Sequence, residues 1–259
     1  MASVLEAVRN KSSVRGRVSA EEWEVRVDLA AAHRFAVMQG WQEPYSIFNH
    51  FAARVPGEPN FMLMKPHKLL FSEVTASNLV KMDMKGKPLG FEDDVNAAGF
   101  AIHTAVLLAR PDVNASAHCH GQAGMAISTL KGGLKFCNQE TMKFYNRLGY
   151  HDFEGIAAMD ECERLARDLG TKNTALILRS HGVLTCGASV AAAVMDLSLL
   201  MRCAEAQLKF MATGDEIIQP SPEICEETAG FTERASARTG ESWDAVKRYI
   251  SRVDASYAE

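Results

Sequence analysis

The chain has 259 residues, a formal net charge of -4 at pH 7 and a hydrophobic fraction of 47%. This composition is sufficient for the core of one large domain, and the slight acidity gives no indication of a nucleic-acid partner. The sequence contains no run of eighteen apolar residues, so it predicts no segment that spans a membrane.

The six cysteines form no Cys-x-x-Cys pair, so we expect reduced thiols and a cytoplasmic protein. Basic side chains dominate the first eighteen residues, but these residues include no apolar signal core. We interpret residues 1–18 as a flexible N-terminal arm. Residues 19–259 are then expected to form a single domain with a C-terminal helical tail.

The first predicted element is a helix that begins at Ser19 and ends near Gly40. It opens with Ser19-Ala20-Glu21-Glu22, which has the form of a capping box, and apolar residues follow at helical spacing. His33 lies within this helix, and we interpret it as a packed or surface residue without a chemical role.

A strand or strand-turn over 46–54 comes next, with Phe61-Met62-Leu63-Met64 as its hairpin partner. Its polar residues Asn49, His50 and Arg54 can form a wall for an anionic substrate, since arginine binds a carboxylate through two hydrogen bonds. The alternative is that they are ordinary surface residues. Glu73 follows an apolar run and precedes a turn, so it is either a catalytic acid or base or a cap.

The remaining elements are predicted from periodicity and from turn residues. His103 lies on the helix over 96–110, where it can approach a neighbouring site or serve as a hydrogen-bonded packing residue. The segment 139–155 is rich in aromatic residues and is predicted to be a long loop with partial strand character. Strands are expected at 80–83, 114–120, 175–179 and 183–187, and helices at 122–129, 159–169, 189–213 and from 241 onward.

Histidines alternate along the predicted strand in Ala117-His118-Cys119-His120-Gly121. Residues two apart on a strand face the same side, so His118 and His120 are expected to share one space while Cys119 packs on the other side. His181 ends another predicted strand and can bring a third imidazole. A bare His-x-His pair is more often an ordinary strand end, and the third histidine favours a metal site.

Three neutral imidazoles suit Zn²⁺ and leave a fourth position for water or substrate. The sequence therefore predicts a divalent metal, Zn first, at His118, His120 and His181. Imidazole also binds Mn, Fe, Co and Ni, and the sequence does not distinguish among these metals.

The chain resembles the class II aldolase/adducin family from about Trp23 to Met211. The resemblance rests on 48–57, on 71–77, on 96–103, on Arg110-Pro111-Asp112-Val113, on the His118/His120 pair, on 144–155 and on Ser180-His181-Gly182. It implies an α/β fold, a three-layer α/β/α domain with a largely antiparallel central sheet. It also implies a homotetramer with active sites near the subunit contacts, and metal ligation by the three histidines.

The sequence departs from the sugar-phosphate aldolases of this family. They carry a catalytic acid where this chain has Gly99, and phosphate-binding serines where it has Ala97 and Ala98. Their glycine-containing phosphate loop corresponds to 47–50 here. The resemblance therefore implies a substrate that is not phosphorylated.

The resemblance implies a metal-dependent lyase that cleaves a C–C bond of a small keto or aromatic acid, by decarboxylation or retro-aldol cleavage, through a metal-stabilised enolate. Glu73, His50, Tyr145 and a metal-bound water are the candidates for proton transfer. Two alternatives remain: a non-catalytic, adducin-like oligomerising scaffold, and an epimerase or dehydratase on the same site. A closed fourth ligand position would favour the scaffold, and the matched motifs contain no fourth protein ligand.

Overall fold

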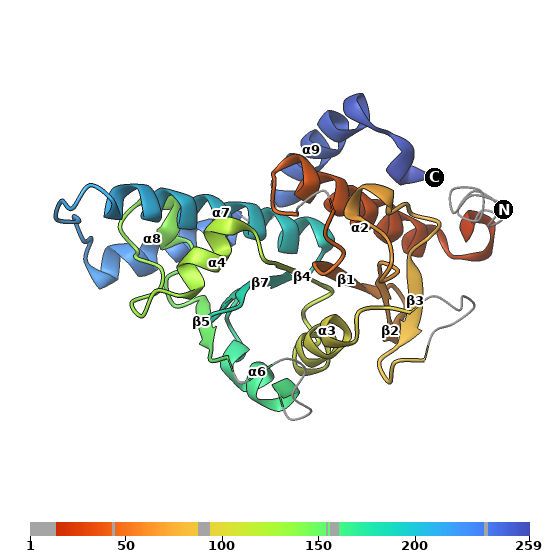
Figure 1. Cartoon of the computed structure of the whole chain (residues 1–259), viewed down its shortest axis with the longest axis horizontal. Helices are drawn as coiled ribbons and strands as arrows, with labels where there is room; N and C mark the ends of the chain where they lie inside the picture. The colour runs from red at the N-terminus through yellow and green to blue at the C-terminus, as the bar shows by residue number, and fades with distance from the viewer. Residues whose placement is uncertain (1–13, 43–44, 88–93, 154, 156–160, 236–237) are drawn as a thin grey trace.

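The computed structural model describes residues 14–42, 45–87, 94–153, 155, 161–235 and 238–259 (Figure 1). One sheet of seven strands crosses the described part of the chain in the order β3-β2-β1-β4-β7-β6-β5. All neighbours are antiparallel except β5 and β6, which are parallel. The strands are β1 His50–Val55, β2 Glu58–Met64, β3 Val80–Asp83, β4 Ala115–Cys119, β5 Leu148–His151, β6 Ala175–Leu178 and β7 Gly182–Gly187.

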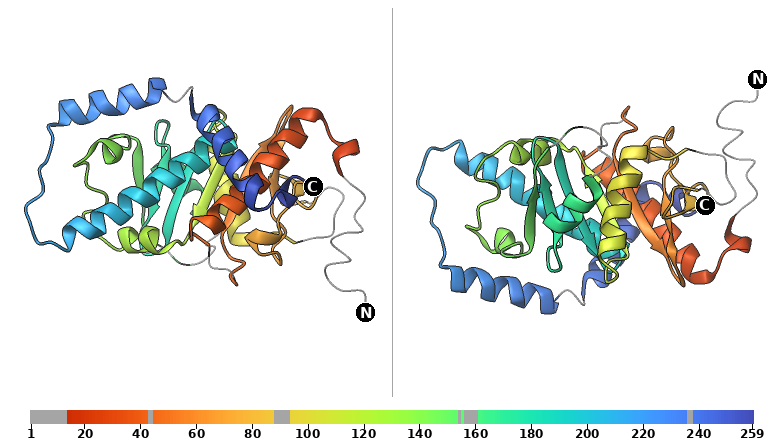
Figure 2. Two further views of the ribbon diagram at one scale, coloured as in Figure 1. Left: turned by 90° about the horizontal axis from the view of Figure 1, so that it is seen from above. Right: turned by 90° about the horizontal axis from the view of Figure 1, so that it is seen from below.

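Helices cover both faces of this sheet. On one face, α2 contacts β1, α7 contacts β4 and β7, and α4 contacts β7, while α3 and α6 cover the other face (Figures 1 and 2). This is the predicted three-layer α/β/α arrangement with a largely antiparallel sheet. The longer helices are α2 Ala20–Met38, α3 Ala97–Ala109, α4 Gln122–Ser128, α6 Glu161–Leu169, α7 Val190–Met211, α8 Pro222–Ala235 and α9 Thr239–Val253.

The short helical segments are η1 Val14–Arg17, η2 Phe71–Glu73, α5 Gln139–Met142 and η4 Ser256–Ala258. No helix of the described residues is long and apolar enough to cross a membrane.

The core has two parts, one on each side of the sheet. Alternate residues of a strand face opposite sides, so Phe51 and Ala53 pack toward α2 and α7, while Ala52 packs toward α3. The part on the α2 and α7 side consists of buried aliphatic and aromatic side chains, and the part on the α3 side of buried aliphatic side chains, methionine and cysteine. The helices on both faces therefore pack against β1, which carries His50, and β4, which carries His118.

The start of α2 confirms the predicted N-cap. The Ser19 hydroxyl accepts a hydrogen bond of 3.1 Å from the backbone N–H of Glu22. The Glu22 carboxylate does not complete the capping box, because it binds Arg26 at 2.8 Å and Lys81 at 2.9 Å. A buried ion-pair network therefore joins α2 to β3.

Three expectations need correction. Residues 14–17 form η1 with Val14 buried, so the predicted arm does not extend to residue 18; residues 1–13 lie outside the described part. The segment 139–155 contains α5 and β5 in addition to loop. The sequence predicts a helix in the C-terminal tail only from residue 241 onward, and the structure has a further helix, α8, before it.

Candidate metal centre

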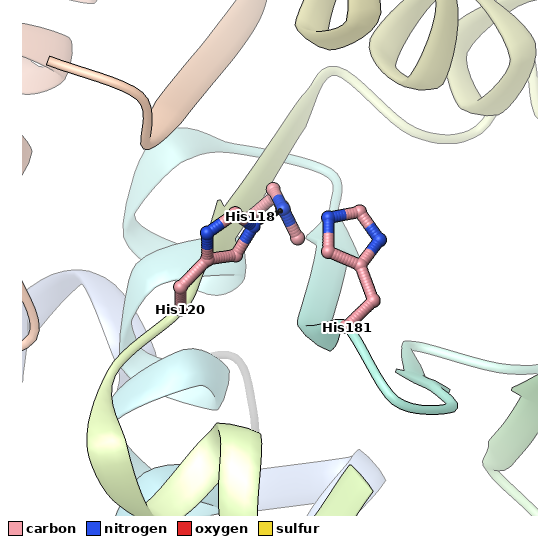
Figure 3. A group of neighbouring side chains, drawn as sticks. All are labelled: His118, His120 and His181. Carbon is pink, nitrogen blue, oxygen red and sulfur yellow. Dashed lines mark hydrogen bonds between the residues drawn. The ribbon is translucent and has the colours of Figure 1, made fainter. Parts of the chain in front are cut away.

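Three histidines converge from two places in the sheet (Figure 3). His118 lies on β4 and is fully buried, and His120 follows the end of that strand. His181 lies in the turn between β6 and β7. Cys119 is buried in the core on the α7 side, which confirms the predicted alternation.

The turn that presents His181 is strained. Ser180 has a φ of 56°, a left-handed conformation that is uncommon for residues other than glycine, asparagine and aspartate. Its backbone N–H donates to the carbonyl of Ser128 at 3.1 Å, which ties the turn to the end of α4. Strain of this kind is concentrated at functional sites.

One ring nitrogen from each of the three histidines lies within 4.8 Å of the others. The Nδ1 of His118 is 2.9 Å from the carbonyl oxygen of Val183, which can only accept, so we assign the ring proton to Nδ1. The lone pair of Nε2 then faces the cluster, 2.8 Å from Nε2 of His120. A backbone carbonyl in this role is the usual outer partner of a metal-binding histidine.

The histidines are held in their neutral form. Burial lowers the pKa of His118 well below its usual range, with smaller contributions from the neighbouring rings. Burial also lowers the pKa of His120, and it lowers that of His181 to about 4. Because a metal ion binds only the unprotonated ring, all three imidazoles are prepared for coordination at neutral pH.

The donor set fits a divalent transition metal. Nitrogen ligands of this type suit Zn²⁺ and its neighbours in the first row. Among the described residues, no cysteine, aspartate or glutamate joins the cluster. A set of three protein ligands is characteristic of an open catalytic site and not of a closed structural one.

A cavity of about 570 Å³ adjoins the cluster. His120 and His181 form part of its wall, and the exposed rings of Phe48 and Phe153 form another part. Its described lining includes no lysine, arginine, aspartate or glutamate. The other lining residues are Ser46, His50, Asn96, Ala98, Ile102, Gly155 and Ser180.

His50 is the predicted proton-transfer candidate that the fold brings to this cavity. The register of β1 and β4 places it directly opposite His118, with 4.9 Å between the ring centroids. Burial, followed by the neighbouring histidines, lowers the pKa of His50 well below its usual range. His103 also reaches this region from α3, so it is both a buried packing residue and a neighbour of the metal centre.

Glu73 and Tyr145 do not line the cavity of their own chain. The exposed carboxylate of Glu73 accepts the N–H of Leu70 at 2.8 Å and thereby caps η2. The ring of Tyr145 packs against Phe136 at a centroid distance of 5.2 Å and faces α8.

Asn49 and Arg54 hold backbone in place. The Asn49 side chain accepts the N–H of His120 at 3.0 Å and donates to the carbonyl of Trp41, so it positions one of the three clustered histidines. Arg54 lies at the other end of β1 and donates to the carbonyls of Leu107 and Pro59, both at 2.6 Å. The structure therefore does not place Arg54 in the cavity.

A family model, the class II aldolase and adducin N-terminal domain, matches residues 27–208. The chain belongs to this family. A provisionally named aldolase class 2 protein of Pseudomonas aeruginosa is 38% identical over 255 residues, which cover 96% of this chain and 97% of that protein. This similarity extends over nearly the whole length of both chains.

A crystal structure of an aldolase II superfamily protein from Pseudomonas syringae superposes with a TM-score of 0.88. It is 39% identical and covers 96% of this chain and all of that one. The alpha-adducin of Rattus norvegicus is 38% identical over 194 residues, which are 73% of this chain and 26% of that protein. The family therefore includes relatives named as aldolases and relatives named as adducins.

Proposed function

We propose that this protein is a metal-dependent lyase that cleaves a C–C bond of a non-phosphorylated keto or aromatic acid, by decarboxylation or retro-aldol cleavage. The observation that carries the proposal is a cluster of three neutral histidines, two of which, His120 and His181, line a cavity whose described wall has no lysine, arginine, aspartate or glutamate. Membership of the class II aldolase family supports a metal-dependent lyase at the coarser level.

His118, His120 and His181 would hold the metal. A divalent ion bound there supplies a Lewis acid that polarises a substrate oxygen and stabilises the negative charge that develops as the C–C bond breaks. The chain provides the rest of the site. Phe48 and Phe153 offer apolar surface to the substrate.

The first turn of α3 opens onto the cavity through Asn96 and Ala98. Asn96 caps the helix by accepting the N–H of Gly99 at 2.8 Å. The positive end of a helix favours a carboxylate. Ala97 and Ala98, the first residues of α3, offer no side-chain hydrogen bonds to a phosphate group. The lining therefore suits a small acid better than a sugar phosphate.

The proposal includes a homotetramer in the cytoplasm. The described cysteines are all free, which agrees with a reducing compartment. Exposed apolar side chains on α8 and α9, among them Phe231 at 64% and Val253 at 67% exposure, supply surface for a subunit contact.

A second candidate function is an oligomerising scaffold like an adducin. The observation that favours it is the match of 38% identity to alpha-adducin over 73% of this chain. The neutral histidine cluster favours the lyase, because a scaffold has no need for three converging imidazoles beside a cavity.

The test is a turnover assay of the purified protein on a panel of keto acids and aromatic acids, with release of CO₂ or aldehyde as the readout. We expect turnover that a chelator abolishes and that added Zn²⁺ restores. His120→Ala should be inactive, because two histidines bind the metal much more weakly than three.

The matched control is His33→Leu, which removes a buried histidine outside the cluster and should keep its turnover. Turnover that survives complete metal removal, or that is equal in His120→Ala and the wild type, would refute the metal-dependent lyase.

A further inference from the structure

The space above Gly99 is occupied by the imidazole of His50. A Cβ atom at position 99 would lie 2.5 Å from Cδ2, 2.6 Å from Cγ and 2.8 Å from Nε2 of that ring. Real Cβ atoms do not approach other atoms so closely. Only glycine at position 99 is therefore compatible with His50 in this place.

His50 is the outer member of a buried chain of hydrogen bonds. Its Nδ1 is 2.9 Å from Nε2 of His103, and the Nδ1 of His103 is 2.6 Å from the Ser116 hydroxyl. All three side chains are at most 4% exposed. The described structure contains no other side-chain hydrogen bond of His50, so its Nε2 edge is the one left for the cavity.

The backbone carbonyl group of His50 determines which ring nitrogens of His50 and His103 carry protons. His103 Nε2 also lies 3.2 Å from the backbone oxygen of His50, which can only accept a hydrogen bond. A proton on His103 Nε2 serves both this oxygen and the Nδ1 of His50. The Ser116 hydroxyl then donates to His103 Nδ1, and neutral His50 carries its proton on Nε2.

We infer that His50 presents an Nε2–H donor to an oxygen atom of the bound acid, and that His103 and Ser116 are positioning residues that fix this tautomer. The inference rests on the proposed function and makes it more specific. A carboxylate at position 99 would offer a hydrogen-bond acceptor, whereas His50 offers a donor. The pair Gly99 and His50 therefore selects a carbonyl or carboxylate oxygen of the substrate.

The tautomer is measured by solid-state NMR of the zinc-loaded protein labelled with ¹⁵N-histidine. The His50 signals are identified by their loss in His50→Gln. We expect a protonated Nε2 and an unprotonated Nδ1 in the wild type. His103→Leu should mix the two tautomers of His50, because the Nδ1 of His50 then loses the N–H donor that keeps it unprotonated. A protonated Nδ1 in the wild type would overturn the assignment.

The donor role is measured by binding of oxalate, a probe with planar carboxylate oxygens, to the zinc-loaded protein. His50→Leu removes the donor and should weaken binding roughly ten- to a hundredfold, as expected for one hydrogen bond to a charged group. His50→Gln keeps an N–H donor and should recover most of the affinity. Equal oxalate affinity in His50→Leu and the wild type would overturn the donor role.

The collision of a Cβ atom at position 99 with the His50 ring is tested by thermal unfolding of Gly99→Ala, His50→Ala and the double variant. Gly99→Ala should lower Tm in the wild type but not when residue 50 is alanine, because the collision is with the ring. An equal fall in Tm in the wild type and in His50→Ala would refute the claim that the His50 ring requires glycine at position 99. Zinc content is measured in parallel. A wild type that binds zinc but has His50 protonated on Nδ1 defeats only this inference. A wild type that binds no zinc defeats the proposed function.

Discussion

His33 shows at the scale of a residue how burial controls protonation in this protein. Its ring is fully buried between Phe51 and Phe71, and its Nδ1 lies 2.6 Å from the carbonyl oxygen of Leu29. Of the two alternatives that the sequence left open, a packed or a surface residue, the structure shows the packed one. Burial first, and nearby cations second, lower its pKa to about 3, despite the opposing effect of the hydrogen bond to Leu29.

This shift predicts a loss of stability in acid. In the unfolded chain His33 takes up a proton near pH 6.5, whereas in the folded protein it stays neutral until about pH 3. Neutral His33 therefore does not reduce the unfolding free energy above pH 6.5, and the unfolding free energy falls as the pH drops from 6.5 toward 3. His33→Leu should reduce the fall in unfolding free energy between pH 7 and pH 5 by roughly 2 kcal/mol.

Urea unfolding of both proteins at the two pH values measures this difference. An equal fall in the wild type and in His33→Leu would show that His33 titrates normally in the folded protein.

The sequence predicts some roles of single residues and not others. The period of two along β4 places His118 and His120 together and sends Cys119 into the core. The contact of Gly99 with His50 depends on how α3 docks on β1, and no local pattern reports it. Ser116 lies two residues before His118 on the same face, which is the one sequence signal that could have indicated its place beside the site.

Two strands meet closely at the end of β4, where Gly182 begins β7. A Cβ atom at position 182 would lie 2.7 Å from the carbonyl oxygen of Cys119 and 3.2 Å from Cδ2 of His120. Gly182→Ala should push the two strands apart and displace His120 from His181. We expect a lower zinc affinity and a stability cost of about 1–3 kcal/mol, as is usual for overpacking.

Zinc titration and thermal unfolding measure both effects. Gly240→Ala is the matched control, because nothing lies within 4 Å of a Cβ atom at that position in α9. Unchanged zinc affinity in Gly182→Ala would show that the strand contact does not position His120.

Elements with their own periodicity were predicted well, and elements held by distant partners were not. The apolar spacing of α2 and α7 and the short apolar runs of β4 and β6 are local signals. By contrast, α8 is a polar helix held by Arg147, which binds Glu226 at 2.5 Å and Glu233 at 2.8 Å. A short parallel strand such as β5 is defined only by its pairing with β6.

At the scale of the whole molecule, the fold brings the three clustered histidines and His50 together beside one cavity. The central strands β1, β4 and β7 carry or flank these residues, and the helices on the two faces hold the strands in register. Glu73 and Tyr145 lie elsewhere on the chain. Among the described lining residues, histidines are therefore the groups with the strongest acid–base character, which agrees with the proposal that they carry the chemistry.

The most direct test of this account is the metal content of the purified protein per subunit, determined by elemental analysis beside a His118→Ala variant. The account predicts about one equivalent in the wild type, as for a site with three protein ligands, and nearly complete loss in the folded variant. A wild type that holds no metal, even after reconstitution with Zn²⁺, would contradict it and would favour the scaffold function.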